Sequence, residues 1–190
     1  MSNSAKITKM FKSKGFTLVE LIIVIVILAI LAAVALPRLT NLQLDARIAK
    51  LNAARGSVAA TSAMVHATLF ARNGRADTAA CPAGGGTANN STSGTGTLCS
   101  EAGIINLVNG YPAVTAIGTS GGILTAAGLT TVFNPSLTEL QAEGYDYTVS
   151  GTTATFQVRG GSSPANCSFT YTEPVANAAP VISIVTTSGC

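Results

Sequence analysis

The sequence predicts an α+β protein in which one long N-terminal helix packs on an antiparallel sheet of roughly four strands. Three observations indicate this fold. A single long apolar run, residues 16–36, is followed directly by an amphipathic stretch with helical spacing. Further along, the apolar residues change to the alternation that is typical of strands. With 190 residues, the chain has room for one globular domain in addition to a membrane segment.

Charge is distributed unevenly along the chain, whose formal net charge is +3. Four of the eleven basic residues lie in the first fourteen positions, where there is no acidic residue: Lys6, Lys9, Lys12 and Lys14. Beyond residue 15, seven basic residues face eight acidic ones, a net charge of −1, which does not indicate a nucleic-acid-binding protein. The lysine cluster is typical of the cytoplasmic flank of a membrane span.

The apolar run is 21 residues long. As a helix it would cover about 30 Å, the thickness of a bilayer core. A conventional secretory signal peptide is the alternative, because basic residues precede the run and small residues end it. The apolar region of such a peptide is only about 7 to 15 residues long and would not carry a carboxylate close to its basic end, where this chain has Glu20. We therefore expect a retained membrane-spanning helix.

Glu20 is the one charged residue of this run. A charge near the centre of a spanning helix costs about 2.5 to 3.5 kcal/mol, and Glu20, five positions into the run, should cost less. Its side chain could be protonated or could reach the headgroups. The alternative is that a positive charge meets it inside the membrane.

The sequence K-G-F-T-L-V-E, residues 14–20, with the apolar helix behind it, closely resembles the class III signal of type IV pilins and pseudopilins. The resemblance implies that a prepilin peptidase removes residues 1–15 as a leader by cutting between Gly15 and Phe16. It also implies that the same enzyme methylates Phe16 as the mature N-terminus. A glycine before the cut leaves no side chain to obstruct the peptidase.

The resemblance further implies what the span does. Residues 16–37 would form the transmembrane and filament-core half of the first helix. Glu20 would pair with the amino terminus of a neighbouring subunit during docking, which fixes axial register more securely than it adds stability. Pro37 would kink or locally melt the helix, because proline removes a backbone donor; the alternative is that it only ends the membrane helix.

Within the family, the chain is most similar to the mannose-sensitive haemagglutinin type of major pilin. The similarity lies in residues 37–47, in Gly110-Tyr111-Pro112 and in the paired C-terminal cysteines. It implies a homopolymer used for attachment, with motility as a further use, and the type IV pilus assembly machinery as partner. The prepilin would sit in the inner membrane with its head in the periplasm, and the assembled pilus would lie on the cell surface. A minor pilin or a type II secretion pseudopilin is the alternative.

Residues 38–74 are predicted to continue the helix as an amphipathic half that ends at Asn73-Gly74. Gly56 and the alanines around it are expected to let the sheet approach closely. The apolar residues at helical spacing are Leu44, Ile48, Leu51, Val58, Val65 and Leu69.

Residues 75–144 are predicted to form a Gly/Ser/Thr-rich loop and short helices. Residues 75–100 have the low complexity of a flexible surface loop, and their Asn90-Ser91-Thr92 is a glycosylation triplet of a kind that is frequently unused. We expect a short helix at residues 101–108, a turn or helix at residues 121–129, and the best-marked helix at residues 134–144.

Residues 145–190 are predicted to form the antiparallel sheet and a disulfide-closed C-terminal region. Apolar residues alternate in residues 145–149 and again in residues 154–158, with a turn at Ser150-Gly151 between them, which predicts a hairpin. Residues 167–172 and 181–186 are typical of two more strands.

The four cysteines, Cys81, Cys99, Cys167 and Cys190, all follow the apolar run. If the basic flank is cytoplasmic, they lie in an oxidising compartment, where disulfides persist. Spacing alone allows three connectivities. The resemblance to type IV pilins implies Cys167–Cys190, which leaves Cys81 for Cys99.

No catalytic or metal-binding pattern stands out. His66 is the sole histidine, no carboxylate completes a triad with it and Ser62 by spacing, and no cysteines form a C-x-x-C pair. We expect a structural protein rather than an enzyme, with no cofactor and no metal.

Overall fold

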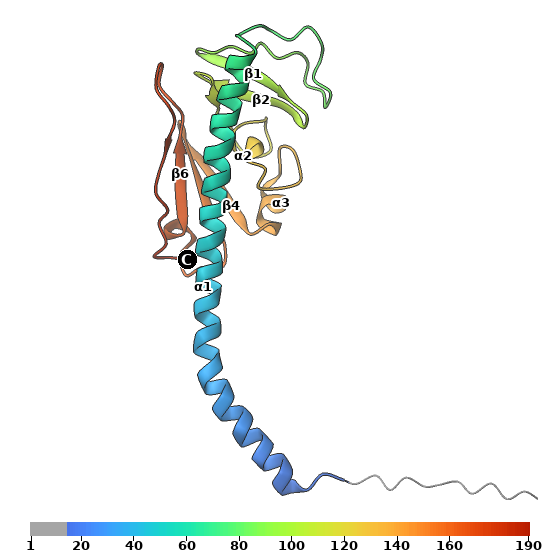
Figure 1. Ribbon diagram of the computed structural model, residues 1–190, viewed down its shortest axis with the longest axis vertical. Helices are drawn as coiled ribbons and strands as arrows, with labels where there is room; N and C mark the ends of the chain where they lie inside the picture. The colour runs from blue at the N-terminus through green and yellow to red at the C-terminus, as the bar shows by residue number, and fades with distance from the viewer. Residues whose placement is uncertain (1–14) are drawn as a thin grey trace, which may run out of the picture. The chain divides into compact units, whose positions relative to one another are not determined.

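The computed structural model describes residues 15–190, except for the side chains of Pro37, Leu39, Thr40 and Asn41. The chain divides into two compact units, Met1–Leu42 and Gln43–Cys190. One continuous helix, α1 (Leu18–Ala71), runs through the boundary between them. The rest of the second unit is built of strands and short helices, so the predicted α+β fold is confirmed (Figure 1).

The second unit holds two antiparallel sheets, with strand orders β1-β2-β3 and β4-β5-β6-β7. In chain order its elements are β1 (Thr95–Ser100), β2 (Gly103–Val108), β3 (Tyr111–Pro112), α2 (Ile123–Ala126), α3 (Leu137–Ala142), β4 (Tyr145–Ser150), β5 (Thr153–Val158), the 3-10 turn η1 (Pro164–Asn166), β6 (Ser168–Thr172) and β7 (Val181–Ile182).

The main core lies between α1 and the four-stranded sheet. Leu51, Ala54 and Val58 of α1 belong to one buried cluster with the aromatic residues of β5 and β6. In the sheet, the ring of Phe156 stacks on Phe169 with a centroid distance of 4.9 Å. Burial of each large side chain stabilises the fold by about 1.5 to 3 kcal/mol. The buried cluster between α1 and the sheet is therefore the main attachment of the helix.

The buried face of α1 differs in part from the predicted one. Leu51, Val58, Val65 and Leu69 are buried as expected, but Leu44 is 38% exposed. The expectation for Gly56 is wrong: it is exposed, and a Cβ placed there would meet no atom within 4 Å. Ala54 is the small residue that the sheet covers, because it shares a helix face with its buried neighbours.

A second sheet occupies part of the region predicted as loop and short helices, residues 75–144. Of residues 101–108, expected as a helix, Gly103–Val108 forms β2. Thr95–Ser100, expected as flexible loop, pairs with it as β1. The physical reason is a period of two: Gly103, Ile105 and Leu107 are buried, and the residues between them are half-buried. An apolar run this short fits either a helix or a strand, and pairing with β1 decides for the strand.

The predicted helix at residues 134–144 is present as α3 (Leu137–Ala142). Ser136 and Glu139 form a capping box, in which the side chain of each accepts a hydrogen bond from the backbone amide of the other. The 121–129 segment holds the one-turn helix α2. Gly144 follows α3 with φ +75, a backbone conformation that favours glycine.

The predicted hairpin is confirmed as β4 and β5, with Tyr145 opposite Val158 and Ser150 opposite Thr153. The strand expected at residues 181–186 is shorter. It pairs with β6 at Val181–Ile182. At Ser183 the pairing becomes irregular: Ser183 N donates to Thr170 O at 3.0 Å, but Thr170 N donates to the Ser183 hydroxyl at 2.9 Å. The segment then meets β6 again at the Ser168–Thr186 bridge.

Three cations on α1 bind backbone carbonyls of the sheet and loops. Arg55 Nε donates to Ser183 O at 2.7 Å, Arg47 Nη1 donates to Cys190 O at 2.6 Å, and Lys50 Nζ donates to Glu143 O. Hydrogen bonds from a charged donor are about twice as strong as neutral ones. The polar positions of the helix therefore add to the attachment that its apolar face provides.

Both disulfides are formed in the pairing that the sequence analysis favoured. Cys81 is bonded to Cys99, with Cα atoms 5.6 Å apart, and Cys167 is bonded to Cys190, with Cα atoms 4.7 Å apart. The first joins the segment after α1 to β1. The second joins the start of β6 to the C-terminal segment.

Candidate processing and assembly segment

The segment that begins at Gly15 enters α1 through a threonine cap. Residues 15–17 have no regular structure, and α1 begins at Leu18. Thr17 O accepts the first helical hydrogen bond, from Leu21 N at 3.2 Å, while Thr17 Oγ1 accepts from Glu20 N, also at 3.2 Å. Thr17 is therefore the N-cap, which satisfies an amide that the helix leaves free.

The Gly15–Phe16 peptide lies just before this cap and is accessible. Phe16 is 85% exposed. A Cβ added to Gly15 would meet no atom within 4 Å, so packing in this chain does not require glycine there. The small residue at this position leaves the peptide bond open to an enzyme that approaches it from outside the helix.

Glu20 lies in the first turn of α1 and is exposed. Within residues 15–190, the ion pairs are Arg72–Asp77 and Arg159–Asp146, and neither involves the Glu20 carboxylate. Its negative charge is favourable near the positive end of the helix dipole, but this effect is worth only about 0.3 to 1 kcal/mol. The carboxylate is thus available to a cation from another molecule.

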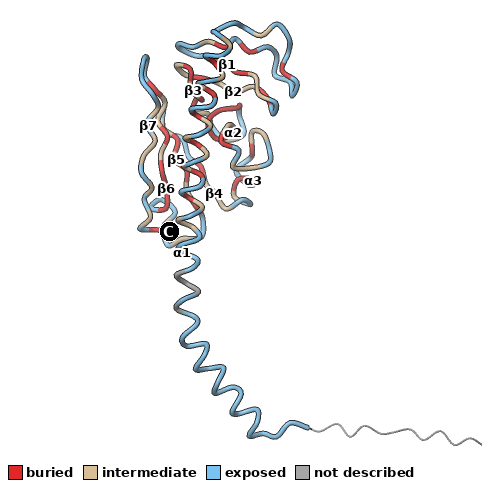
Figure 2. Tube along the Cα trace, in the orientation of Figure 1, coloured by how far each residue is buried: buried red, intermediate tan, exposed pale blue. Residues whose placement is uncertain are grey.

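The helix behind Glu20 has the length and composition of a membrane span. Leu18–Leu36, 19 residues with a mean hydropathy of 3.2, has none of its residues buried (Figure 2). A continuous apolar surface of this size is stable only against lipid or against other apolar surfaces. Pro37 follows inside α1, which is helical on both sides of it, and the kink stays a prediction.

The remaining sequence-predicted residues have structural surroundings. His66 stacks on Tyr111 with a centroid distance of 3.9 Å, and its Nδ1 lies 3.0 Å from Gly110 O. Ser62 is buried in the helix–sheet contact. The two disulfides join loops to strands and lie outside the N-terminal segment.

Two features of the structure were not predicted from the sequence. The Thr17 cap carries a readable signal, because Thr17-Leu18-Val19-Glu20 fits the capping-box pattern. A polar network that joins the partly exposed Arg72 and Asp77 to the buried Asn90 had no comparable signal, since its members are brought together by the fold.

Residues 10–36 match the prokaryotic N-terminal methylation motif. This match supports a type IV pilin-like prepilin. The matched residues contain Gly15, Phe16 and Glu20 together with most of the apolar span, and residues 10–14 lie outside the described part of the chain. Comparison with curated proteins and with solved structures found no match. A prepilin of this kind is a substrate of prepilin peptidase and is anchored in the membrane before it is assembled.

Proposed function

We propose that this chain is the structural subunit of a type IV pilus used for surface attachment. It is made as a prepilin whose lysine-rich leader, residues 1–15, stays on the cytoplasmic side of the inner membrane while the head, the second unit, folds in the periplasm. The observation that carries the proposal is the methylation motif at residues 10–36, together with the apolar span Leu18–Leu36, none of whose residues is buried.

In this account, a prepilin peptidase cuts the Gly15–Phe16 peptide and methylates the amino group of Phe16. The mature span then leaves the bilayer and packs among the spans of other copies, with Glu20 against the amino terminus of a neighbour. A buried ion pair contributes specificity more dependably than stability, so its role is to set the axial register of the incoming subunit.

The finer assignment is to a major pilin of the mannose-sensitive haemagglutinin type. Gly110-Tyr111-Pro112, one of the features behind it, comprises the strand β3 and the glycine that precedes it. Gly110 has φ +81, and a Cβ there would lie 3.2 Å from His66 Nδ1. Glycine at this position therefore has a structural reason in this fold. The subtype rests on sequence resemblance.

The second candidate is a minor pilin or a type II secretion pseudopilin, because the matched motif covers only residues 10–36, which such proteins would share. Mass spectrometry of sheared surface filaments separates the candidates. A major pilin is the predominant protein of the filaments. If the protein instead stays in the cell envelope and its deletion blocks secretion, the pilus proposal fails.

A further inference from the structure

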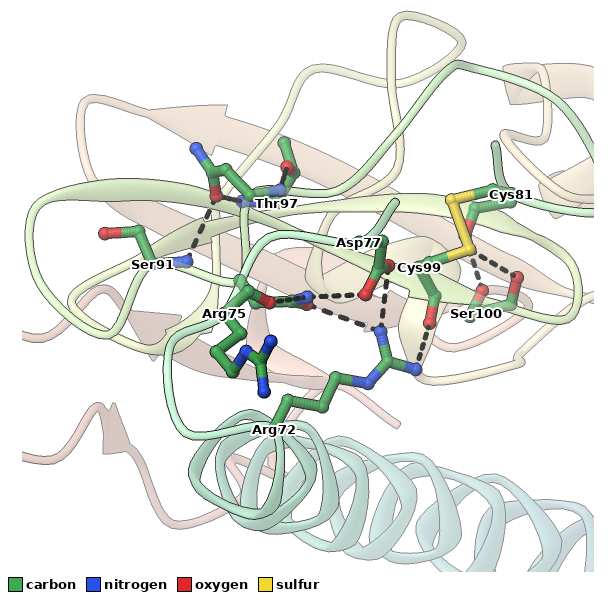
Figure 3. A network of polar contacts seen from close by, with 11 residues as sticks. Arg72, Arg75, Asp77, Cys81, Ser91, Thr97, Cys99 and Ser100 are labelled. Carbon is green, nitrogen blue, oxygen red and sulfur yellow. Dashed lines mark hydrogen bonds and ion pairs between the residues drawn. A yellow bond between two sulfur atoms is a disulfide. The ribbon is translucent and has the colours of Figure 1, made fainter. Parts of the chain in front are cut away.

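A single guanidinium joins three segments of the chain around the Cys81–Cys99 disulfide (Figure 3). Arg72 follows the last residue of α1. Its Nη1 lies 3.2 Å from Asp77 Oδ2 and 3.3 Å from Asn90 Oδ1, and its Nη2 donates to Cys99 O at 3.2 Å. The end of the helix, the segment after it and β1 therefore share one cation.

Asn90 is the centre of this network and is fully buried. Its Nδ2 donates to Arg75 O and to Asp77 Oδ1, both at 2.7 Å. Its backbone N donates to Thr97 O in β1 at 2.9 Å. The polar atoms of its side chain all have partners, whereas Arg72 and Asp77 are partly exposed. A buried amide that is fully satisfied favours one well-defined geometry.

The network holds the chain beside both cysteines without using their sulfur atoms. Asp77 N donates to Ala88 O at 2.8 Å, which closes the segment that contains Cys81 into a loop. A carboxylate oxygen of Asp77 and the sulfurs of Cys81 and Cys99 all lie within 4.8 Å of one another. In β1, the carbonyl that accepts the hydrogen bond from Arg72 Nη2 is that of Cys99 itself. Noncovalent contacts thus flank both cysteines of this disulfide.

We propose that the network formed by Arg72, Asp77 and Asn90 selects the Cys81–Cys99 disulfide by holding residues 75–90 on β1 before the sulfurs are joined. Four cysteines allow three connectivities, and loop closure already favours the observed one, because Cys81 with Cys167 or Cys190 would close a much longer loop than Cys81 with Cys99. This preference grows only with the logarithm of the loop length, so the network adds to a modest bias. A network that brings one pair of sulfurs together raises the rate for that pair alone. This inference does not depend on the proposed function.

The chemistry is ordinary thiol–disulfide exchange with a small disulfide such as oxidised glutathione. One cysteine loses its proton to solvent, and its thiolate attacks the glutathione disulfide, which releases one glutathione thiolate and leaves a mixed disulfide. The thiolate of the other cysteine then attacks the protein sulfur of that mixed disulfide and releases the second glutathione. Two protein thiols are oxidised, and one glutathione disulfide is reduced. The network acts on the second step, because that step requires the two protein sulfurs to meet.

Oxidative refolding of the full chain tests the proposal. Protein that has been reduced and denatured is refolded in detergent with reduced and oxidised glutathione, and its disulfides are mapped under non-reducing conditions. The test variant is Arg72→Gln. The matched control is Arg159→Gln, which removes the other ion pair of the second unit, Arg159–Asp146 at 3.1 Å, in place of Arg72–Asp77 at 3.2 Å.

We expect the wild type and Arg159→Gln to form predominantly Cys81–Cys99, and Arg72→Gln to form at least twofold more of the other pairings. Wild-type pairing in Arg72→Gln would overturn the proposal. An equal rise in mispairing in Arg159→Gln would also overturn it, because general destabilisation would then be the cause.

A second measurement remains informative if Arg72→Gln refolds poorly. The double variant Cys81→Ser/Cys99→Ser keeps the network without the covalent bond, and residues 82–87 are exposed and open to a non-specific protease. We expect this variant to be cut at a rate within about twofold of the oxidised wild type, and the same variant with Arg72→Gln added to be cut much faster. Rapid cleavage of the double cysteine variant would show that the disulfide, not the network, holds the segment, and the proposal would fail.

Discussion

At the level of single residues, the proposed assembly depends mainly on Glu20. It lies in the first turn of α1, its backbone amide is capped by Thr17, and its carboxylate is exposed. Local structure therefore accounts for the backbone of this residue but not for its charge. In the proposed assembly, the cation that pairs with this carboxylate is the amino terminus of the next subunit.

The first prediction concerns this charge. Glu20→Ala and Glu20→Gln should insert and be cleaved normally but should form little filament, because the docking amino terminus is left unpaired in a low dielectric, at a cost of about 3 to 5 kcal/mol. Glu20→Asp, which keeps the charge on a shorter side chain, should retain more filament than Glu20→Gln. The measurement is the yield of sheared filaments relative to total cleaved protein. Normal yield in both uncharged variants would remove the electrostatic account of docking.

Asn90 gives a second prediction at the residue scale. Asn90→Asp replaces a buried donor with a carboxylate oxygen that faces Asp77 Oδ1 and Arg75 O. The loss should exceed the roughly 1 to 3 kcal/mol typical of an unsatisfied buried polar group. The matched control is Asn89→Asp, because Asn89 Oδ1 only accepts hydrogen bonds, from Ser91 N and Thr97 N, and a carboxylate keeps both. Denaturant unfolding measures the difference, and equal stability of the two variants would contradict the network.

The same burial bears on the glycosylation triplet at Asn90. Its Nδ2, the atom that would carry the sugar, is buried and donates two hydrogen bonds. The folded head therefore cannot present this asparagine to a glycosylating enzyme.

The next scale is that of the elements, where α3 provides a test of local structure. Hydrogen bonds from the backbone amide and hydroxyl of Ser136 lower the pKa of Glu139 from its ordinary value of 4.5. A lowered folded-state pKa means that the contribution of the carboxylate to stability is fully present above the ordinary value. It is lost as the pH falls through the folded-state pKa.

We therefore expect Glu139→Gln to reduce the loss of thermal stability on acidification, because the glutamine side chain keeps a neutral cap that does not titrate. The control is Glu143→Gln, because Glu143 is also exposed and lies just past the helix. This variant should lose thermal stability on acidification as the wild type does. Ser136→Ala removes the other half of the box and should cost about 1 kcal/mol at neutral pH. Identical pH profiles for Glu139→Gln and the wild type would contradict the role of the box.

The elements also show what the sequence could and could not predict. The span was predictable from the length of its apolar run. The amphipathic half of α1 and the β4–β5 hairpin were predictable from helical spacing and from alternation around a turn. β1 and β2 were missed for opposite reasons. The residues of β1 are mostly small and polar, as in a loop, and those of β2 are a short apolar run that also fits a helix. Their pairing and the Arg72 network depend on contacts that no local pattern encodes.

At the scale of the whole molecule, the stability of the head depends on buried tyrosines. Tyr147 Oη donates to Thr115 O at 3.0 Å, and Tyr171 Oη donates to Pro112 O at 2.8 Å. Burial raises the pKa of both phenols above the ordinary value of 10. A raised folded-state pKa means that their contribution is fully present below the ordinary value and is lost as the pH rises beyond it.

The free energy of unfolding should consequently fall above about pH 10, because the unfolded phenols ionise before the folded ones. Tyr147→Phe should lose about 1 kcal/mol at neutral pH, from one hydrogen bond, but should show a shallower alkaline decline. Denaturant titrations on either side of pH 10 provide the comparison. If the free energy of unfolding of Tyr147→Phe falls above pH 10 as steeply as that of the wild type, ionisation of Tyr147 does not cause the alkaline loss of stability.

The two units of the chain differ in how they satisfy their apolar surface. The second unit buries its large side chains between α1 and the sheets, whereas the span in the first unit buries none of its residues. The span therefore needs lipid or other apolar surfaces to cover it. The proposed assembly therefore requires that the span is retained after processing.

The mass of the mature N-terminal peptide shows directly whether the span is retained. Protein purified from cells that assemble it is digested, and its N-terminal peptide is identified by mass spectrometry. We predict that the mature chain begins at Phe16, carries one methyl group on its amino nitrogen and keeps the whole apolar span. A chain that still carries residues 1–15, or one that has been cut after the span near residues 32–37, would contradict it.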